Sequence, residues 1–265
     1  DDRLENLFVV GYSDITRTHF TDGAESYYAE GDRALYRYQG TFTVNAANKL
    51  AFGAEREDTT ANDLDSSIDS LFALYEYTPV EKLIFRASWG QGFKAPTIFQ
   101  STYVCSFCGL TEPNANLKPE TSEAYDVGVD WLSPDGRAQA GIAVFHQETE
   151  NMIDFSYTAG YDNIAFVTSE GLELTGGYQF TNWLGVSANY AYIDAEDGNG
   201  NALVRMPEHS GDVTVSLDPE GPLSGAVLVR YNGEEPNSSG GTLDSWTRVD
   251  LTGRYDLTDS VELFA

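Results

Sequence analysis

Apolar and polar residues alternate at every second position along most of this chain. Tyr36, Tyr38 and Phe42 fall on one face of a predicted strand, and Arg37 and Gln39 fall on the other. Successive side chains of a β-strand point to opposite sides, so the pattern predicts strands with one apolar and one polar face. No segment shows a convincing helical period. We therefore expect an all-β protein of roughly 13 antiparallel strands, each paired with its sequence neighbour, and almost no helix.

The connections between the predicted strands alternate between short and long. Short turns are expected at Asn45–Lys49, Thr78–Glu81, Ser133–Gly136, Thr181–Asn182, Asp218–Pro222 and Thr258–Ser260. Long polar loops are expected at Thr21–Asp32, Asp58–Ser70, Phe93–Glu120, Glu150–Asn163, Asp194–Pro207 and Asn232–Ser245. Tight turns on one side and long loops on the other are typical of a bacterial transmembrane β-barrel. The aromatic residues beside the short turns would then form an interfacial girdle: Tyr77, Trp131, Phe180, Trp183 and Tyr255.

Composition narrows the class further. The chain has 15 basic and 42 acidic residues among 265, a formal net charge of −27. Such a chain offers no basic stripe to neutralise phosphates, which excludes nucleic acid as a partner. No stretch approaches the roughly 18 apolar residues of a membrane helix, but barrel strands hide their lipid face in alternation.

The alternation also predicts which side chains face lipid and which face the barrel lumen. The predicted lipid-facing set is Tyr36, Tyr38, Phe42, Val127, Val129, Leu174, Tyr178, Val186, Val213, Val227, Val249 and Leu251. The predicted lumenal set is Arg37, Asp126, Asp130, Glu173, Gln179, Arg248, Asp250 and Arg254. A shift of one residue in register would invert every assignment together.

Two motifs resemble segments of one known family. The segment Ser88–Thr97 reads SWGQGFKAPT, and Asn114–Ser122 reads NANLKPETS. Together they resemble the "ASxGxGFKAPT" and "NPNLKPExS" segments of TonB-dependent outer-membrane receptors, in particular the cobalamin and siderophore receptors. The residues that carry the resemblance are Gly90, Gly92, Phe93, Lys94, Ala95, Pro96, Thr97, Asn116, Leu117, Lys118, Pro119 and Glu120. We interpret them as structural, because glycines relax a strand and prolines end strand pairing.

The resemblance implies a barrel of about 22 strands with a plugged lumen. Residues 1–265 would be part of that barrel domain, with the plug domain and the last strands outside this sequence. The first strand near Leu4–Tyr12 and the stub at Val261–Ala265 would then be free edges. The implied partners are outer-membrane lipid, a small metal chelate or corrinoid, and an inner-membrane TonB-type energy coupler that acts through the plug. The implied location is the bacterial outer membrane, and the implied activity is import rather than catalysis, with no cofactor.

Two other functions stay open from the sequence. One is a passive porin or autotransporter barrel, which needs no plug. The other is a soluble, acidic, all-β binding module such as a lectin.

The sequence also contains a cysteine pair and two groups of carboxylate and amide residues, and none of them requires a catalytic or metal-binding role. Cys105 and Cys108 form a Cys-x-x-Cys pair in a long loop, and we expect a disulfide rather than half of a zinc site, because no further cysteine is present. Asp197, Asn199, Asn201 and Glu208 match positions of a calcium-loop template, and Asp58, Asp63, Asp65 and Asp69 form a carboxylate cluster. We expect both groups to be solvated surface. We identify neither a catalytic group nor a metal site in the sequence.

Overall fold

The computed structural model describes the chain except residues 1–2, 62–63, 106–108, 157–159, 220 and 259. Its strands are β1 (Leu4–Thr21), β2 (Ala24–Asn45), β3 (Asn48–Ala61), β4 (Leu64–Val80), β5 (Leu83–Lys94), β6 (Glu120–Leu132), β7 (Ala138–Ser156), β8 (Gly160–Thr181), β9 (Leu184–Asp197), β10 (His209–Leu217), β11 (Leu223–Asn232), β12 (Glu235–Pro236), β13 (Thr242–Leu243), β14 (Trp246–Thr258) and β15 (Val261–Phe264). The one helical element of the described residues is α1 (Ile98–Ser101). In the described part of the chain, no helix is long and apolar enough to cross a membrane.

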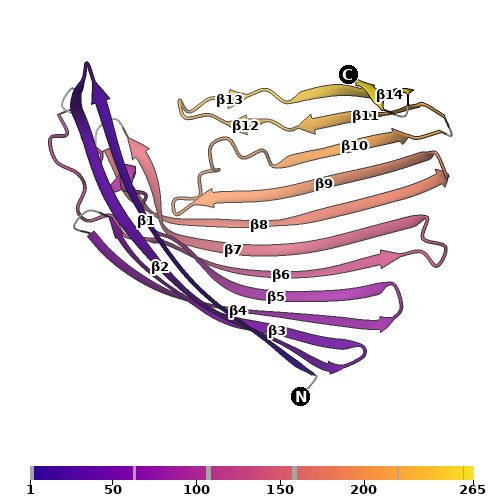
Figure 1. Cartoon of the computed structure of the whole chain (residues 1–265), viewed down its shortest axis with the longest axis horizontal. Coiled ribbons are helices and arrows are strands. Elements are labelled where there is room, and N and C mark those ends of the chain that lie inside the picture. Colours follow the sequence, from indigo (N-terminus) through magenta and orange to yellow (C-terminus); the bar gives the residue numbers. More distant parts are fainter. Residues whose placement is uncertain (1–2, 62–63, 106–108, 157–159, 220, 259) are drawn as a thin grey trace. The chain divides into compact units, whose positions relative to one another are not determined.

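The strands form a meander in which sequence neighbours lie side by side (Figure 1). Within the described residues the main sheet has 13 strands, in the order β1 to β11, then β14 and β15, while β12 and β13 form a separate two-stranded ladder. This confirms the predicted all-β meander. Strands β1 and β15 stand at the two ends of the order, so each pairs on one side only among the described residues, as predicted.

The chain divides into two compact units. The first contains residues 1–75, 88–125 and 147–168, and the second contains residues 76–87, 126–146 and 169–265. The first unit holds the β1–β3 hairpins and the loop with α1. The second holds most of the short turns and all of β9–β15.

The described residues of all six predicted short turns lie where one strand ends and the next begins, which confirms the turn positions; residues 220 and 259, in the last two turns, lie outside the described part. The turn after β6 shows how such a turn is closed. The Ser133 hydroxyl donates to the Asp135 carboxylate at 2.6 Å, and the Arg137 amide donates to the same oxygen at 3.1 Å. These two hydrogen bonds lower the pKa of Asp135, because they favour its ionised form.

Three of the predicted long loops are wrong, because the strands continue through them. The range 21–32 is a hairpin in which β1 and β2 meet at a two-residue turn, Asp22-Gly23. Both residues have positive φ, 53° and 81°, as the commonest hairpin turn requires. Strands β3 and β4, and likewise β7 and β8, also occupy the described residues of their polar ranges, which exclude residues 62–63 and 157–159. A strand that is exposed to water on both faces needs no alternation of apolar and polar residues. Its sequence is therefore easily predicted as a polar loop.

The two faces of the sheet differ in the second unit. Cross-strand partners place Val186, Val215, Val227 and Leu251 in one row over β9, β10, β11 and β14. On the other face, Asn189 donates to Asp212 at 3.2 Å, and Arg248 to Asp250 at 2.9 Å. The register therefore confirms that the predicted apolar set of these strands shares one face. We call it the apolar face and the other the polar face.

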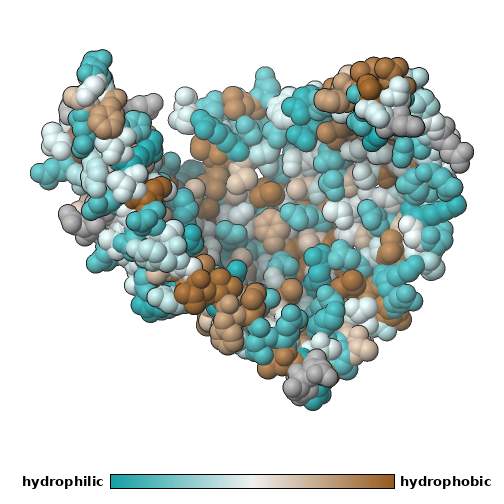
Figure 2. Space-filling model, viewed as in Figure 1, coloured by the Kyte–Doolittle hydropathy of each residue, from teal (hydrophilic) through white to brown (hydrophobic). Residues whose placement is uncertain are grey.

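The β1–β3 hairpins show the same separation along their length. The rings of Phe8 and Tyr38 lie 4.9 Å apart, and Tyr38 and Phe52 follow at 6.2 Å, all on one face. The opposite face carries the Arg37–Glu55 ion pair at 3.0 Å. Figure 2 shows apolar side chains gathered over the middle of these strands, and mixed hydrophilic and apolar ones toward the tip of the β1–β2 hairpin.

Candidate functional site

The two motifs that carry the family resemblance flank one long loop. Strand β5 ends at Lys94, and β6 begins at Glu120, so the loop comprises residues 95–119. Pro96 lies just after the first strand and Pro119 just before the second. Proline has no amide to donate to a ladder, which explains why strand pairing stops at both places.

Lys94 and Glu120 join the two motifs directly. The Lys94 ammonium donates to the Glu120 carboxylate at 2.9 Å, and the Ile153 amide of β7 donates to the same carboxylate oxygen at 3.0 Å. The Glu120 side chain is 14% exposed, against 55% for Lys94. One nearly buried carboxylate therefore ties the ends of the loop to the next hairpin.

The second motif makes further contacts with the β7–β8 hairpin. The Lys118 amide donates to the Asn163 side chain at 2.8 Å, and Asn163 donates back to the Lys118 carbonyl at 3.0 Å. Asn114 donates to the Tyr161 carbonyl at 3.1 Å and to Asp162 at 3.2 Å. These hydrogen bonds hold the last part of the loop against β8.

The first motif starts the short helix α1 and fixes it to β2. Thr97 caps the helix, accepting from the Gln100 amide at 3.2 Å while its own amide donates to the Gln100 side chain at 2.9 Å. Beyond the helix, Thr102 lies 2.6 Å from the Tyr27 hydroxyl, and a Cβ at Gly31 would meet the Ile98 side chain at 3.0 Å. Tyr27 and Gly31 share the polar face of β2 with Arg37, so the loop folds over that face.

Four aromatic rings meet where the loop reaches the β7–β8 hairpin. We call Phe99, Tyr103, Phe155 and Tyr161 the aromatic cluster. The centroid of Tyr103 lies 5.6 Å from Phe99, 5.4 Å from Phe155 and 5.3 Å from Tyr161. Phe99 is 47% exposed, so the cluster presents a ring at the surface. Such a surface can stack against a flat or apolar ligand.

Sequence reasoning missed the aromatic cluster. Its members come from two predicted long loops, Phe93–Glu120 and Glu150–Asn163, and are more than 50 residues apart at the extremes. The available signal was the presence of several Tyr and Phe residues in segments otherwise predicted to be polar loops.

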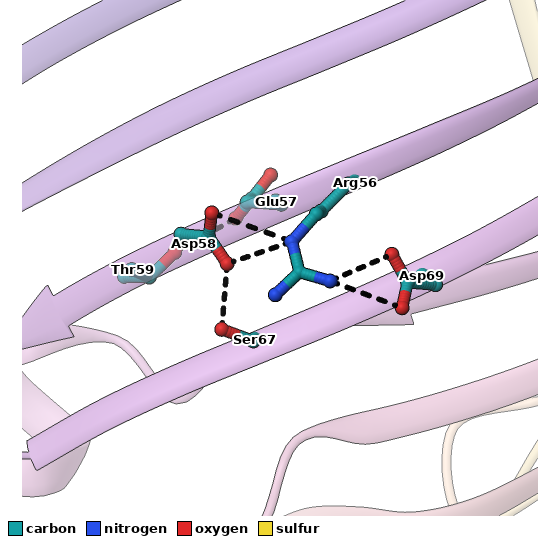
Figure 3. Close-up of polar contacts among 6 residues, drawn as sticks. All are labelled: Arg56, Glu57, Asp58, Thr59, Ser67 and Asp69. Carbon is teal, nitrogen blue, oxygen red and sulfur yellow. Dashed lines mark hydrogen bonds and ion pairs between the residues drawn. The ribbon is translucent and has the colours of Figure 1, made fainter.

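The predicted carboxylate cluster is arranged around an arginine in Figure 3. Arg56 of β3 donates to Asp58 at 3.2 Å and to Asp69 of β4 at 3.4 Å, and the Ser67 hydroxyl donates to Asp58 at 2.6 Å. Asp65 accepts from the Thr60 hydroxyl at 3.0 Å. Asp63 lies outside the described residues. Apart from the Arg56–Asp58 contact, which lies within β3, these contacts join β3 to β4 and stabilise the pairing of the two strands.

Three of the four calcium-template residues, Asp197, Asn199 and Asn201, form an ordinary turn, and Glu208 lies outside it, where its carbonyl accepts from the Ile193 amide at 2.9 Å. The Asp197 carboxylate accepts from the backbone amides of Asn199 and Asn201, both at 2.9 Å, and from the Asn201 side chain at 3.0 Å. Asp197 would supply the first ligand of the calcium template. Its carboxylate instead accepts hydrogen bonds that close the turn.

Cys105 forms an isolated antiparallel bridge with Leu110 within the long loop. Its backbone exchanges two hydrogen bonds with Leu110, at 2.8 and 2.9 Å. Cys108 falls outside the described residues, so the disulfide stays a prediction.

We expect Cys105 and Cys108 to be oxidised to each other in the exported protein, because the outer side of the membrane is oxidising. Alkylation without reduction should then leave both residues unlabelled, and the intact mass should lack two hydrogens. A control sample reduced before alkylation should carry two labels. Labelling of both thiols in the unreduced protein would contradict the prediction.

The sequence and the fold match one family. Residues 36–265 match the family model described as "TonB dependent receptor-like, beta-barrel". The chain is 31% identical over 232 residues to the metal-pseudopaline receptor CntO of Pseudomonas aeruginosa, covering 82% of this chain and 31% of that protein. It is 29% identical over 192 residues to the vitamin B12 transporter BtuB of Vibrio vulnificus, covering 71% of this chain and 30% of that protein.

Solved structures agree on the fold. The chain superposes on the copper transporter OprC with a TM-score of 0.80 and 16% identity, over 99% of this chain and 47% of that one. It superposes on the siderophore receptor PiuA of Acinetobacter baumannii with a TM-score of 0.74 and 17% identity, over 91% of this chain and 39% of that one. The chain spans about a third of the length of the two curated relatives, CntO and BtuB. The family consists of outer-membrane transport receptors, which removes the soluble binding module from consideration. This chain belongs to the TonB-dependent receptor β-barrel family and is a protein of the bacterial outer membrane.

Proposed function

We propose that this chain forms part of the wall of an import receptor for a metal chelate or a corrinoid. Its relatives include proteins named for a metal–pseudopaline complex and for vitamin B12, which supports these two ligand classes. Energy would come from an inner-membrane TonB-type coupler acting through the plug domain of the family.

The observation that carries the proposal is the arrangement of the loop of residues 95–119. Its ends are tied by Lys94 and Glu120, and it folds over the polar face of β2, which faces the lumen in a barrel of this family. Because these contacts fix the loop to strands of the barrel wall, the aromatic cluster would lie beside the lumen in a fixed position. Rigid aromatic side chains give a ligand contact at low entropic cost.

Uptake by cells that carry the receptor in their outer membrane tests this proposal. We expect accumulation of either radiolabelled cobalamin or a radiolabelled metal chelate, and its loss when the inner-membrane energy coupler is deleted. Replacement of Phe99 and Tyr103 by alanine should weaken ligand binding by about tenfold, since stacked aromatic contacts are worth roughly 0.5–1.5 kcal/mol beyond their buried area.

The matched control is a pair of aromatic residues on the apolar face. Tyr178 and Phe180 have ring centroids 4.8 Å apart, and their replacement by alanine should leave ligand affinity unchanged. Uptake that persists without the energy coupler would support the passive porin instead. Equal losses of affinity in both variant pairs would show that the aromatic cluster has no specific role.

A further inference from the structure

The apolar face of the second unit contains a groove near its short turns. The groove has a volume of about 380 Å³ and lies over β10, β11 and β14. Its floor is formed by Gly225 and Gly253, which are direct cross-strand partners. Gly253 also exchanges two backbone hydrogen bonds with Ala265, at 3.0 and 2.9 Å. Small residues therefore lie at the same level on β11, on β14 and directly after β15.

Larger apolar side chains surround this floor. Val227 and Leu251, again cross-strand partners, form the wall on one side. Leu217, Leu223 and Trp183 lie toward the turns, and the backbone of Trp183 accepts a hydrogen bond from the Asp218 amide at 2.8 Å. A Cβ built on Gly253 would meet no atom within 4 Å, so the space above the floor is open.

The location of the groove indicates its occupant. The apolar face of an outer-membrane barrel contacts lipid, and the short turns of such barrels lie on the periplasmic side. The groove therefore opens to the inner leaflet, at the level where Trp183 would sit in the interface. Its volume accommodates about a dozen groups of the size of a water molecule, which matches a segment of one acyl chain.

A second protein copy is a poorer match. A stable protein–protein interface buries roughly 1,200–2,000 Å² in total, far more than a groove a few side chains wide provides. A single hydrocarbon chain in the groove would instead contact protein on three sides, and many small dispersion contacts would add up.

We propose that this groove binds one acyl chain of a phospholipid from the inner leaflet as a resident lipid. The proposal rests on the membrane location of the family and not on the identity of the imported ligand.

Native mass spectrometry of the receptor in detergent tests the proposal. The protein is purified from outer membranes, stripped of lipid and titrated with palmitoyl-oleoyl phosphatidylethanolamine. We expect saturable retention of one phospholipid. Gly253→Phe should fill the groove and weaken that retention by about tenfold or more. The matched control is Val249→Phe, which adds the same ring to the same face of β14 but outside the groove, and it should retain the lipid.

A second measurement uses the unaltered groove, so it stands even where Gly253→Phe prevents folding. The chain has four tryptophans, and replacing Trp89, Trp131 and Trp246 by phenylalanine leaves Trp183 as the reporter. A phosphatidylethanolamine brominated on its acyl chain should quench Trp183 with saturation at one lipid per protein. Non-saturable quenching would overturn the proposal. Equal lipid retention in wild type and folded Gly253→Phe, or an equal loss in Val249→Phe, would overturn it too.

Discussion

Replacing Leu251 by arginine should lower the free energy of unfolding in lipid vesicles by about 2–4 kcal/mol. Leu251 is 72% exposed and lies mid-strand in the apolar row with Val227. Exposure of a leucine to lipid costs nothing, whereas a guanidinium at the same place would lose its hydration. The effect should be among the largest of any single surface substitution in this chain.

The matched control is Thr252→Arg, one residue further along β14. Because side chains alternate, Thr252 lies on the polar face with Asp250 and Arg254, and an arginine there would stay in water. We expect a change of less than about 0.5 kcal/mol. Denaturant unfolding of both variants in vesicles, followed by tryptophan fluorescence, measures the difference. Equal destabilisation by the two substitutions would mean that the assignment of the faces is inverted.

Replacing Glu120 by alanine should release the loop of residues 95–119 from the β7–β8 hairpin. The substitution removes the acceptor of the Ile153 amide, and a part-buried amide without a partner costs about 1–3 kcal/mol. Hydrogen exchange should therefore accelerate at the Ile153 amide, and limited proteolysis should cut within the loop.

The Lys94–Glu120 ion pair contributes less than the Ile153 hydrogen bond. Lys94 is more than half exposed, and pairs of that kind are worth up to about 1 kcal/mol. We therefore expect Lys94→Met, which keeps most of the side-chain stem, to accelerate exchange at Ile153 far less than Glu120→Ala. Glu120→Gln keeps an acceptor and should behave like Lys94→Met. If Lys94→Met accelerates exchange at Ile153 as much as Glu120→Ala does, the ion pair holds the loop, and the hydrogen bond from the Ile153 amide does not.

This comparison assigns a role to the family motifs. Lys94 and Glu120 belong to segments that were interpreted as structural, and their contacts with each other and with Ile153 agree with that interpretation. We propose that they position the aromatic cluster, while the ligand contact is proposed for Phe99 and Tyr103, which lie outside both motifs.

The sequence alone determined the meander, the short turns and the two faces of the strands. Alternation with a period of two follows directly from strand geometry, so Val249 and Leu251 could be placed on one face without any structure. The Asp22-Gly23 turn was not predicted: both residues adopt positive φ readily, but the polar residues around them led to the prediction of a long loop.

Only the tertiary structure decided which residues meet across the chain. Lys94 reaches Glu120, and Phe99 and Tyr103 reach Phe155 and Tyr161, through loop contacts that no local pattern specifies. Gly225 faces Gly253 because the register of β11 against β14 places them opposite each other. Local geometry fixes which way a side chain points, but register and loop packing depend on free-energy differences summed over distant segments.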